Sequence, residues 1–417
     1  MSRRRASQRT SQRGTPRVAV AARLGRLAER LSRSTGLGSG GVIGGRVLLA
    51  LAPQAPRELA RNREVVLVSG TNGKTTTSTY LTACLRTRSP VDHNADGANT
   101  PAGIVRALAA GSAPVVVLET DEGWLPWTLE QTRARTAVLL NLSRDQLHRH
   151  HEVAAVASSW HSALSGLDHA VANCDDPDVV FSALAASRQT WVGVGIRWTQ
   201  DALVCPRCGQ ECRRTAEDWR CTCGLRRPTP HWRLEGADLV GDTRRVALQV
   251  GLPGQANLAN AAMAVVAATT LGADPQDAAD SLRDIVSIAG RYDVLESAGR
   301  RARLILAKNP AGWVEALGLV SAGTAPLVLA FSSDGVDGRD PSWLYDVPFA
   351  GITGRPVVVT GRRATDMVVR LQMDGLSDVR RAPNVVSALA MVPPGPVDVV
   401  ANYGAFQDAR RELGHAS

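Results

Sequence analysis

The stretch 67–81, LVSGTNGKTTTSTYL, constrains the fold more than any other part of the chain. The β-branched run REVVLVSG predicts a buried strand, Gly70 and Gly73 predict a turn, and KTTTSTYLTACLR predicts a helix. A strand, a glycine loop and a helix N-terminus in this order are typical of a phosphate-binding loop, whose backbone N–H groups surround phosphate oxygens. We therefore expect an α/β fold with a nucleotide-binding central domain.

Lysine is almost absent from this chain, which makes its positions informative. Of 48 Lys and Arg residues, only Lys74 and Lys308 are lysine. A compact ammonium on a flexible stem reaches between the β- and γ-phosphates of a nucleotide, where a planar guanidinium is too wide. The pattern G-x-x-x-x-G-K-[ST] is incomplete because Val68 replaces its first glycine, but G-T-N-G-K-T-T remains. The predicted nucleotide-binding residues of the loop are Gly70, Thr71, Asn72, Gly73, Lys74, Thr75 and Thr76.

Acidic residues follow two apolar runs that we interpret as strands. VVVLETDEGWL places Glu119, Asp121 and Glu122 after the first run, and AVLLNLSRD places Asp145 after the second. Carboxylates at the ends of parallel strands are suitable ligands for Mg²⁺, and the hydroxyl of Thr75 is a further candidate ligand. The histidines within residues 148–151 have no matched partners, so we interpret them as a polar helix face.

The segment CPRCGQECRRTAEDWRCTCG predicts a metal site. Cys205 and Cys208 form a C-P-x-C-G knuckle, and Cys221 and Cys223 form C-x-C-G. Four thiolates so grouped, in a chain without an export signal, favour structural Zn²⁺ over disulfides. Because the second knuckle is one residue short, Cys212 remains an alternative ligand. Four thiolates leave the metal no open coordination position for a substrate, so we expect the metal to stabilise the fold of a small inserted ribbon.

Charge is concentrated at the start of the chain. The formal net charge is +9, and residues 1–35 contain ten arginines against a single acid, Glu29. We interpret this segment as a solvated arm with weak attraction to anionic lipid, followed from residue 18 to 34 by a helix that fits either packing or a membrane surface. No run of about 18 apolar residues spans a bilayer. We expect a cytoplasmic protein, and its basic arm is compatible with a peripheral position at the inner face of the plasma membrane.

Several motifs carry a resemblance to a known family. VSGTNGKTTT resembles the ATP-binding loop of the Mur ligases and folylpolyglutamate synthetases, which activate a carboxylate as an acyl phosphate for attack by an amine. NADGANTPAGI, AVLLNLSRDQLHRHHE and GQANLANAAMAVVAA follow in the family's order. The resemblance implies ATP and Mg²⁺ as cofactors, Glu119 as a catalytic Mg²⁺ ligand, and Asn257 and Asn260 beside the adenine.

The ribbon and the last third of the chain resemble the MurT-like branch of this family. The matching segments are GRYDVL, AKNPAGW and DGVDGRDPSW. The resemblance implies that Arg291 faces the nucleotide, that Lys308 neutralises charge on the forming acyl phosphate, and that Asp337 or Asp340 completes the site of a glutaminase partner. Catalysis would then depend on Lys74, Glu119, Lys308, Asp337 and Asp340.

The same resemblance implies a reaction and a partner. Members of this branch amidate the α-carboxylate of D-glutamate in the lipid II stem peptide, using ammonia from a separate GatD-like glutaminase. The present chain fits dependence on a partner, because its two cysteines outside the ribbon, Cys84 and Cys174, do not lie in a glycine-flanked nucleophile turn.

The expected domains are a basic, flexible arm with the start of the first helix at 1–35, a Mur-ligase-like ATP-binding domain at 36–289 with a zinc ribbon at about 200–232, and a smaller C-terminal Mur-ligase-like α/β domain at 290–417. Two alternatives are a stand-alone amino-acid ligase of the Mur or folylpolyglutamate type and an ATPase that binds nucleic acid through the ribbon. The chain has only 4 Phe and 4 Tyr, and no aromatic-rich basic face indicates a nucleic-acid partner.

Overall fold

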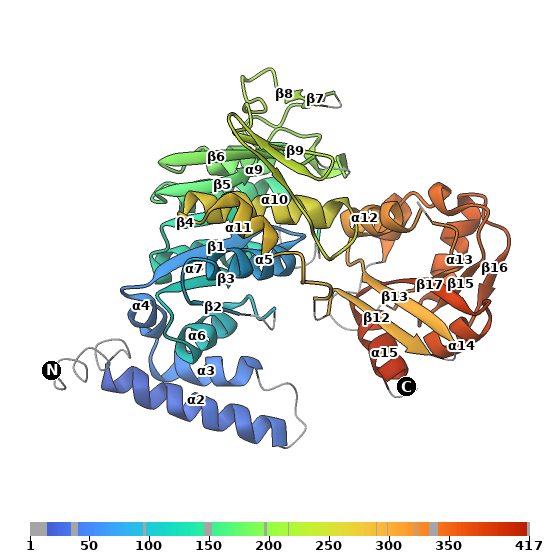
Figure 1. Cartoon of the computed structure of the whole chain (residues 1–417), viewed down its shortest axis with the longest axis horizontal. Coiled ribbons are helices and arrows are strands. Elements are labelled where there is room, and N and C mark those ends of the chain that lie inside the picture. The colour runs from blue at the N-terminus through green and yellow to red at the C-terminus, as the bar shows by residue number, and fades with distance from the viewer. Residues whose placement is uncertain are drawn as a thin grey trace.

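A computed structural model describes residues 15–34, 41–94, 97–145, 152–195, 198–215, 217–288, 290–297, 299–321, 323–332 and 341–414. Two sheets dominate the described chain (Figure 1). The larger has nine strands in the order β11-β10-β9-β6-β5-β4-β1-β3-β2, and the smaller has six in the order β12-β13-β17-β14-β15-β16. A third, two-stranded sheet lies in the ribbon region.

The large sheet is parallel from β2 through to β9 and ends in an antiparallel meander. Its strands are β1 Glu64–Ser69, β2 Val91–His93, β3 Val115–Glu119, β4 Thr136–Leu139, β5 His169–Asn173, β6 Arg188–Gly193, β9 Trp232–Glu235, β10 Asp238–Gly241 and β11 Arg245–Ala247. The central strands are almost continuously apolar because helices cover both faces of this sheet.

One face of the large sheet packs against the helices of the first half of the chain. These are α3 Gly41–Leu51, α4 Ala55–Ala60, α6 Pro101–Ala110, α7 Leu125–Thr132, α8 Val153–Leu164 and α9 Pro177–Ala183. The opposite face packs against α5 Lys74–Arg86, α10 Gln255–Thr270 and α11 Pro275–Asp280. Helix α2, Pro16–Ser34, lies outside α3 as an additional layer (Figure 1).

The ribbon interrupts the chain between two neighbouring strands, β6 and β9. It contains the short strands β7 Arg213–Arg214 and β8 Trp219–Arg220, which pair antiparallel. Figure 1 shows it projecting from the end of the large sheet. An insertion at this point leaves the parallel pairing of β6 with β9 intact.

The second sheet forms the core of the C-terminal part of the chain. Its strands are β12 Tyr292–Ser297, β13 Arg300–Leu306, β14 Leu327–Ala330, β15 Val357–Thr360, β16 Val379–Arg381 and β17 Gly395–Ala401. Its covering helices are α12 Pro310–Ser321 and α13 Ala364–Met373 on one face, and α14 Val385–Ala390 and α15 Tyr403–Gly414 on the other. The chain passes from one sheet to the other between α11 and β12.

Candidate nucleotide-binding and catalytic site

The predicted phosphate-binding loop connects β1 to α5, as the sequence indicated. Gly70 has φ +149° and Gly73 has φ +85°, and the latter is the N-cap of α5. A Cβ atom at Gly73 would lie 2.3 Å from Oδ1 of Asn260. Both the backbone conformation and the space therefore exclude a larger residue at this position.

The loop is fixed by the segment that follows β4. Asn72 donates its backbone N–H to Oδ1 of Asn141 (3.0 Å), and the Asn141 side chain donates back to the Asn72 carbonyl (3.0 Å). Thr71 Oγ1 accepts a hydrogen bond from the backbone of Ser143 (3.0 Å). These hydrogen bonds within the protein fix the conformation of the loop, so the loop is largely preorganised.

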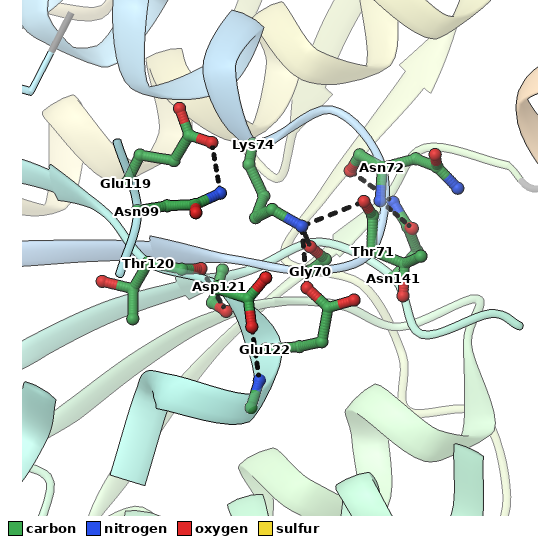
Figure 2. A network of polar contacts seen from close by, with 12 residues as sticks. Gly70, Thr71, Asn72, Lys74, Asn99, Glu119, Thr120, Asp121, Glu122 and Asn141 are labelled. Carbon is green, nitrogen blue, oxygen red and sulfur yellow. Dashed lines mark hydrogen bonds and ion pairs between the residues drawn. The ribbon is translucent and has the colours of Figure 1, made fainter. Parts of the chain in front are cut away.

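Lys74 is buried at the centre of this network (Figure 2). Its Nζ donates to the carbonyls of Gly70 and Thr71 and to Oε2 of Glu122 at 2.8 Å. Burial acts to lower the pKa of the Lys74 ammonium, but the charges of Glu122 and the neighbouring acids outweigh it, and the pKa is raised. Lys74 is therefore a fixed positive charge at the loop.

A short turn explains why Glu122, among three neighbouring acids, contacts Lys74. After β3, Asp121 accepts a hydrogen bond from Gly123 N and caps the 3₁₀ turn Glu122–Trp124. The Glu122 carbonyl accepts the indole N–H of Trp160 at 2.8 Å. With its backbone fixed in this way, the Glu122 carboxylate points to the lysine (Figure 2).

Glu119 offers a vacant carboxylate oxygen next to the loop. It is fully buried at the end of β3, and its Oε1 accepts from Asn99 Nδ2 at 3.1 Å. Its Oε2 is buried and has no hydrogen-bond partner among the residues that the structure describes. An orphaned carboxylate oxygen is costly unless a cation or water uses it, so Glu119 fits the role of a Mg²⁺ ligand. The Thr75 hydroxyl is chemically suited to be a second oxygen ligand for Mg²⁺.

Helix α10 forms the side of the pocket expected to hold the adenine. Asn257 and Asn260 lie in its first two turns and line the pocket. Asn257 Nδ2 donates to the Pro253 carbonyl (2.7 Å), and Asn260 Oδ1 accepts from the Thr77 hydroxyl (3.2 Å). Asn260 thus connects α10 to α5 directly behind the loop.

The opposite wall comes from the C-terminal part of the chain. Arg291 Nη2 donates to Thr75 Oγ1 at 3.1 Å, across 216 residues of sequence. Lys308 follows β13, and its Nζ lies 5.8 Å from the centroid of the Tyr403 ring. A second link between the two parts joins Arg144 to Asp346, at 3.2 Å.

One pocket brings most of the predicted residues together. Those that line it are Thr71, Asn72, Gly73, Lys74, Thr75, Thr76, Asn257, Asn260, Arg291 and Lys308. Glu119 is not among its lining residues; it is fully buried and accepts a hydrogen bond from Asn99. Asp337, Asp340 and the histidines at 148–151 fall outside the described residues.

The sequence analysis missed several pocket residues. Asn141 and Ser143 hold the loop, and Asn173 and Asp176 line the pocket after β5. Burial raises the pKa of Asp176 to about 6, against three backbone N–H groups that lower it. The signal available was the cluster of polar residues directly after two apolar strands, NLS and NCDD, which resembles the pattern that identified Glu119.

The four predicted zinc ligands converge. The Sγ atoms of Cys205, Cys208, Cys221 and Cys223 all lie within 4.8 Å of one another. The Cys205–Cys223 and Cys208–Cys221 Sγ pairs are 3.6 and 3.4 Å apart. Four sulfurs at this spacing fit tetrahedral coordination of a thiolate-binding metal. Cys212, also described, is not part of the group.

The ribbon is anchored to the wall of the pocket. The Trp219 indole donates to the Cys174 carbonyl (3.0 Å), and Arg214 Nη2 donates to the Asp175 carbonyl (3.1 Å). The Asp175 carboxylate pairs with Arg227 and accepts the backbone N–H groups of Val194 and Gly195, which line the pocket. The ribbon therefore supports the segments around β5 and β6 that border the nucleotide site.

Comparisons with known proteins agree with this architecture. The family described as Mur ligase middle domain matches residues 68–268, and the one described as MurT ligase C-terminal matches residues 306–406. A curated relative from Staphylococcus aureus (strain N315), named lipid II isoglutaminyl synthase (glutamine-hydrolyzing) subunit MurT, is 28% identical over 387 residues, covering 85% of this chain and 87% of its own length.

Solved structures show the same fold. A pseudomurein peptide ligase type C from Methanothermus fervidus superposes with a TM-score of 0.66 at 17% identity, over 89% of this chain and 84% of the other. MurF ligase from Thermotoga maritima in complex with ADP gives 0.60 at 16% identity, over 88% and 84%. The predicted Mur-ligase-like α/β fold is confirmed, whereas the exact domain boundaries and residue roles remain predictions.

Proposed function

We propose that this chain is the ATP-dependent amidating subunit of a lipid II isoglutaminyl synthase, because residues 68–268 match the Mur ligase middle domain and residues 306–406 match the MurT ligase C-terminal domain. The observation that carries the proposal is the pocket in which Lys74 and Lys308 come from opposite walls. The substrate is the α-carboxylate of D-glutamate in the lipid II stem peptide, and the product is the D-isoglutamine amide. The name of the S. aureus relative supports this assignment.

The reaction takes two steps. A carboxylate oxygen of the substrate attacks the γ-phosphorus of ATP, which forms an acyl phosphate and releases ADP. Ammonia then attacks the acyl carbon, phosphate leaves, and the amide nitrogen loses a proton.

The residues of the loop hold the nucleotide. The N–H groups at the start of α5 and the Lys74 ammonium would meet the β- and γ-phosphates, and Asn257 and Asn260, which line the pocket, would border the base. Mg²⁺, held by Glu119 and Thr75, would screen the phosphate charge. The Thr75 hydroxyl, which accepts a hydrogen bond from Arg291, would be the second oxygen ligand beside Glu119.

The second wall serves the acyl phosphate. Lys308 is placed to neutralise the phosphate oxygens as the acyl phosphate forms and when it leaves. A preorganised cation on a separate domain contributes only when the two domains are correctly docked. Two contacts join the two domains: Arg291 bonds to Thr75, and Arg144 pairs with Asp346.

We also propose a partner and a structural metal. The word "subunit" in the relative's name implies a second polypeptide, and a GatD-like glutaminase would supply the ammonia. Asp337 or Asp340 remains the candidate acid at that interface. The Cys205, Cys208, Cys221 and Cys223 cluster would hold Zn²⁺ with no open position, so the metal has a folding role.

The experiment supplies ammonia without the partner. Lipid II is incubated with this chain, ATP, Mg²⁺ and concentrated ammonium, and the product is examined by mass spectrometry. We expect the mass change of replacing one hydroxyl by an amino group, located at D-glutamate, and its loss in Lys74→Ala. Addition of a supplied amino acid instead would assign the chain to the stand-alone ligases, and no ATP-dependent change would contradict the proposal.

A further inference from the structure

Helix α2 has one face fixed against the protein. Val18 and Ala21 are buried against the large domain. A Cβ atom on Gly25 would lie 2.6 Å from the Gly44 carbonyl oxygen of α3, so the two helix backbones touch there. Glu29 is 8% exposed and pairs with Arg106 of α6 at 3.4 Å. The orientation of α2 is therefore set by packing.

The opposite face presents a stripe of large apolar side chains. Val20, Leu24, Leu27 and Leu31 are 54%, 44%, 53% and 58% exposed. Their spacing of four, three and four residues places them on one line along the helix. Single exposed apolar residues are ordinary on a protein surface, but four in one stripe on one helix indicate a binding surface. We call these four residues the α2 stripe.

Arginines border the α2 stripe. Arg23 and Arg30 are exposed, and at about 3.6 residues per turn they lie along one edge of it. Arg17 lies along the other edge, where its Nε donates to the Leu51 carbonyl at 2.9 Å. The only acid of α2 is Glu29, on the packed face. The outward face of α2 consequently combines apolar and basic side chains with no acidic one.

We propose that the α2 stripe lies in the surface of an anionic lipid bilayer, and this rests on the proposed function in that its substrate is lipid II. An apolar line flanked by arginine is the composition of helices that lie in the plane of a membrane interface. Leucines enter the acyl boundary, and the arginines meet phosphate groups of the lipids. A second protein chain would need acidic residues against these arginines.

The geometry of the rest of the molecule is compatible with this orientation. Figure 1 shows α2 as the outermost element at its end of the molecule, with the ribbon at the opposite end of the large sheet. Within the described ranges, none of the helices is both long and apolar enough to cross a bilayer. Contact through the outward face of α2 would leave the ribbon, at the opposite end of the large sheet (Figure 1), in water.

The test measures binding of the full chain to vesicles by flotation. The probes are vesicles of phosphatidylglycerol mixed with phosphatidylcholine, and vesicles of phosphatidylcholine alone. We expect binding to the anionic vesicles and a loss of about tenfold or more in the double variant Leu24→Glu, Leu27→Glu. The matched control is Val369→Glu, Met373→Glu, whose parent residues are 43% and 66% exposed on α13. It should bind as the unchanged chain does.

Three outcomes overturn the inference. The unchanged chain fails to bind anionic vesicles, the α2 double variant binds equally well, or the α13 variant loses as much binding. Size-exclusion chromatography with light scattering accompanies the assay. A dimer that the α2 variant dissociates, without vesicle binding by either form, would assign the stripe to a second copy of the chain.

A second readout separates this inference from the proposed function. Amidation is measured with lipid II in anionic vesicles and with a short-chain, water-soluble analogue. We expect the α2 double variant to amidate the analogue normally and the vesicle substrate at least about tenfold more slowly. If the α2 double variant amidates the vesicle substrate as fast as the unchanged chain does, membrane docking is contradicted and the proposed function is not. If the unchanged chain amidates neither substrate, the proposed function is contradicted.

Discussion

The two walls of the nucleotide pocket differ in how they are built. Lys74 is held by three oxygen partners within the large domain, and the loop around it is fixed by Asn141. Lys308 lies just after β13 of the second sheet and reaches the same pocket only through the docking of the two parts. One wall is thus assembled by local contacts, and the other by contacts between domains. Changes on the first wall should affect nucleotide binding, and changes on the second should affect chemistry.

The largest expected effect comes from Lys74→Arg. The charge is kept, but the planar guanidinium cannot occupy the space between Gly70, Thr71 and Glu122. We expect kcat/KM for ATP to fall by about 10³-fold, measured as ADP release in the presence of lipid II and ammonium. A loss below about tenfold would contradict the view that the local wall is preorganised around an ammonium.

A smaller and different effect is expected for Lys308→Met. Methionine keeps the length of the side chain and removes the charge opposite the forming acyl phosphate. We expect kcat to fall by about a hundredfold. Calorimetric titration with a non-hydrolysable ATP analogue should give a nearly unchanged Kd. Equal losses in kcat and in nucleotide affinity would show that the two walls are not functionally separate.

The smallest effect concerns Glu122→Gln and appears in stability. Glutamine keeps an oxygen acceptor but leaves the buried Lys74 ammonium without its closest opposite charge. We expect the free energy of unfolding to fall by about 1–3 kcal/mol, measured by denaturant titration. Glu130→Gln, at an exposed site on α7, is the control.

The Glu122→Gln variant also tests whether the Glu122–Lys74 ion pair persists when nucleotide is bound. If phosphate replaces Glu122 as the partner of Lys74, saturating ATP analogue should reduce the stability difference between Glu122→Gln and the unchanged chain. A difference that is the same with and without nucleotide would mean that the Glu122–Lys74 pair persists in the bound state.

Sequence reasoning was strongest where one element dictates the next. A turn at Gly70 and Gly73 and a helix directly after it were predicted, and the structure has both, with Gly73 at a positive φ. The strand before Lys308 and the four-cysteine cluster were also correctly placed. In each case the informative residues lie within one short segment of the chain, the longest being 205–223, so few distant contacts are needed to set their geometry.

It was weaker where side-chain direction depends on distant packing. Three acids follow β3, and the choice of Glu122 as the Lys74 partner depends on a capped turn and on the indole of Trp160. The hold of Asn141 on the loop crosses 69 residues. For the helix predicted at residues 18–34, packing and membrane contact were equally compatible with the pattern, and α2 has a face suited to each.

The central claim is that this pocket activates a carboxylate as an acyl phosphate, and oxygen transfer tests it most directly. Lipid II carrying ¹⁸O in the α-carboxylate of D-glutamate is amidated with ATP and ammonium, and the released phosphate is analysed by mass spectrometry. The account predicts one labelled oxygen in phosphate for each amide formed. Amide formation with unlabelled phosphate would contradict it.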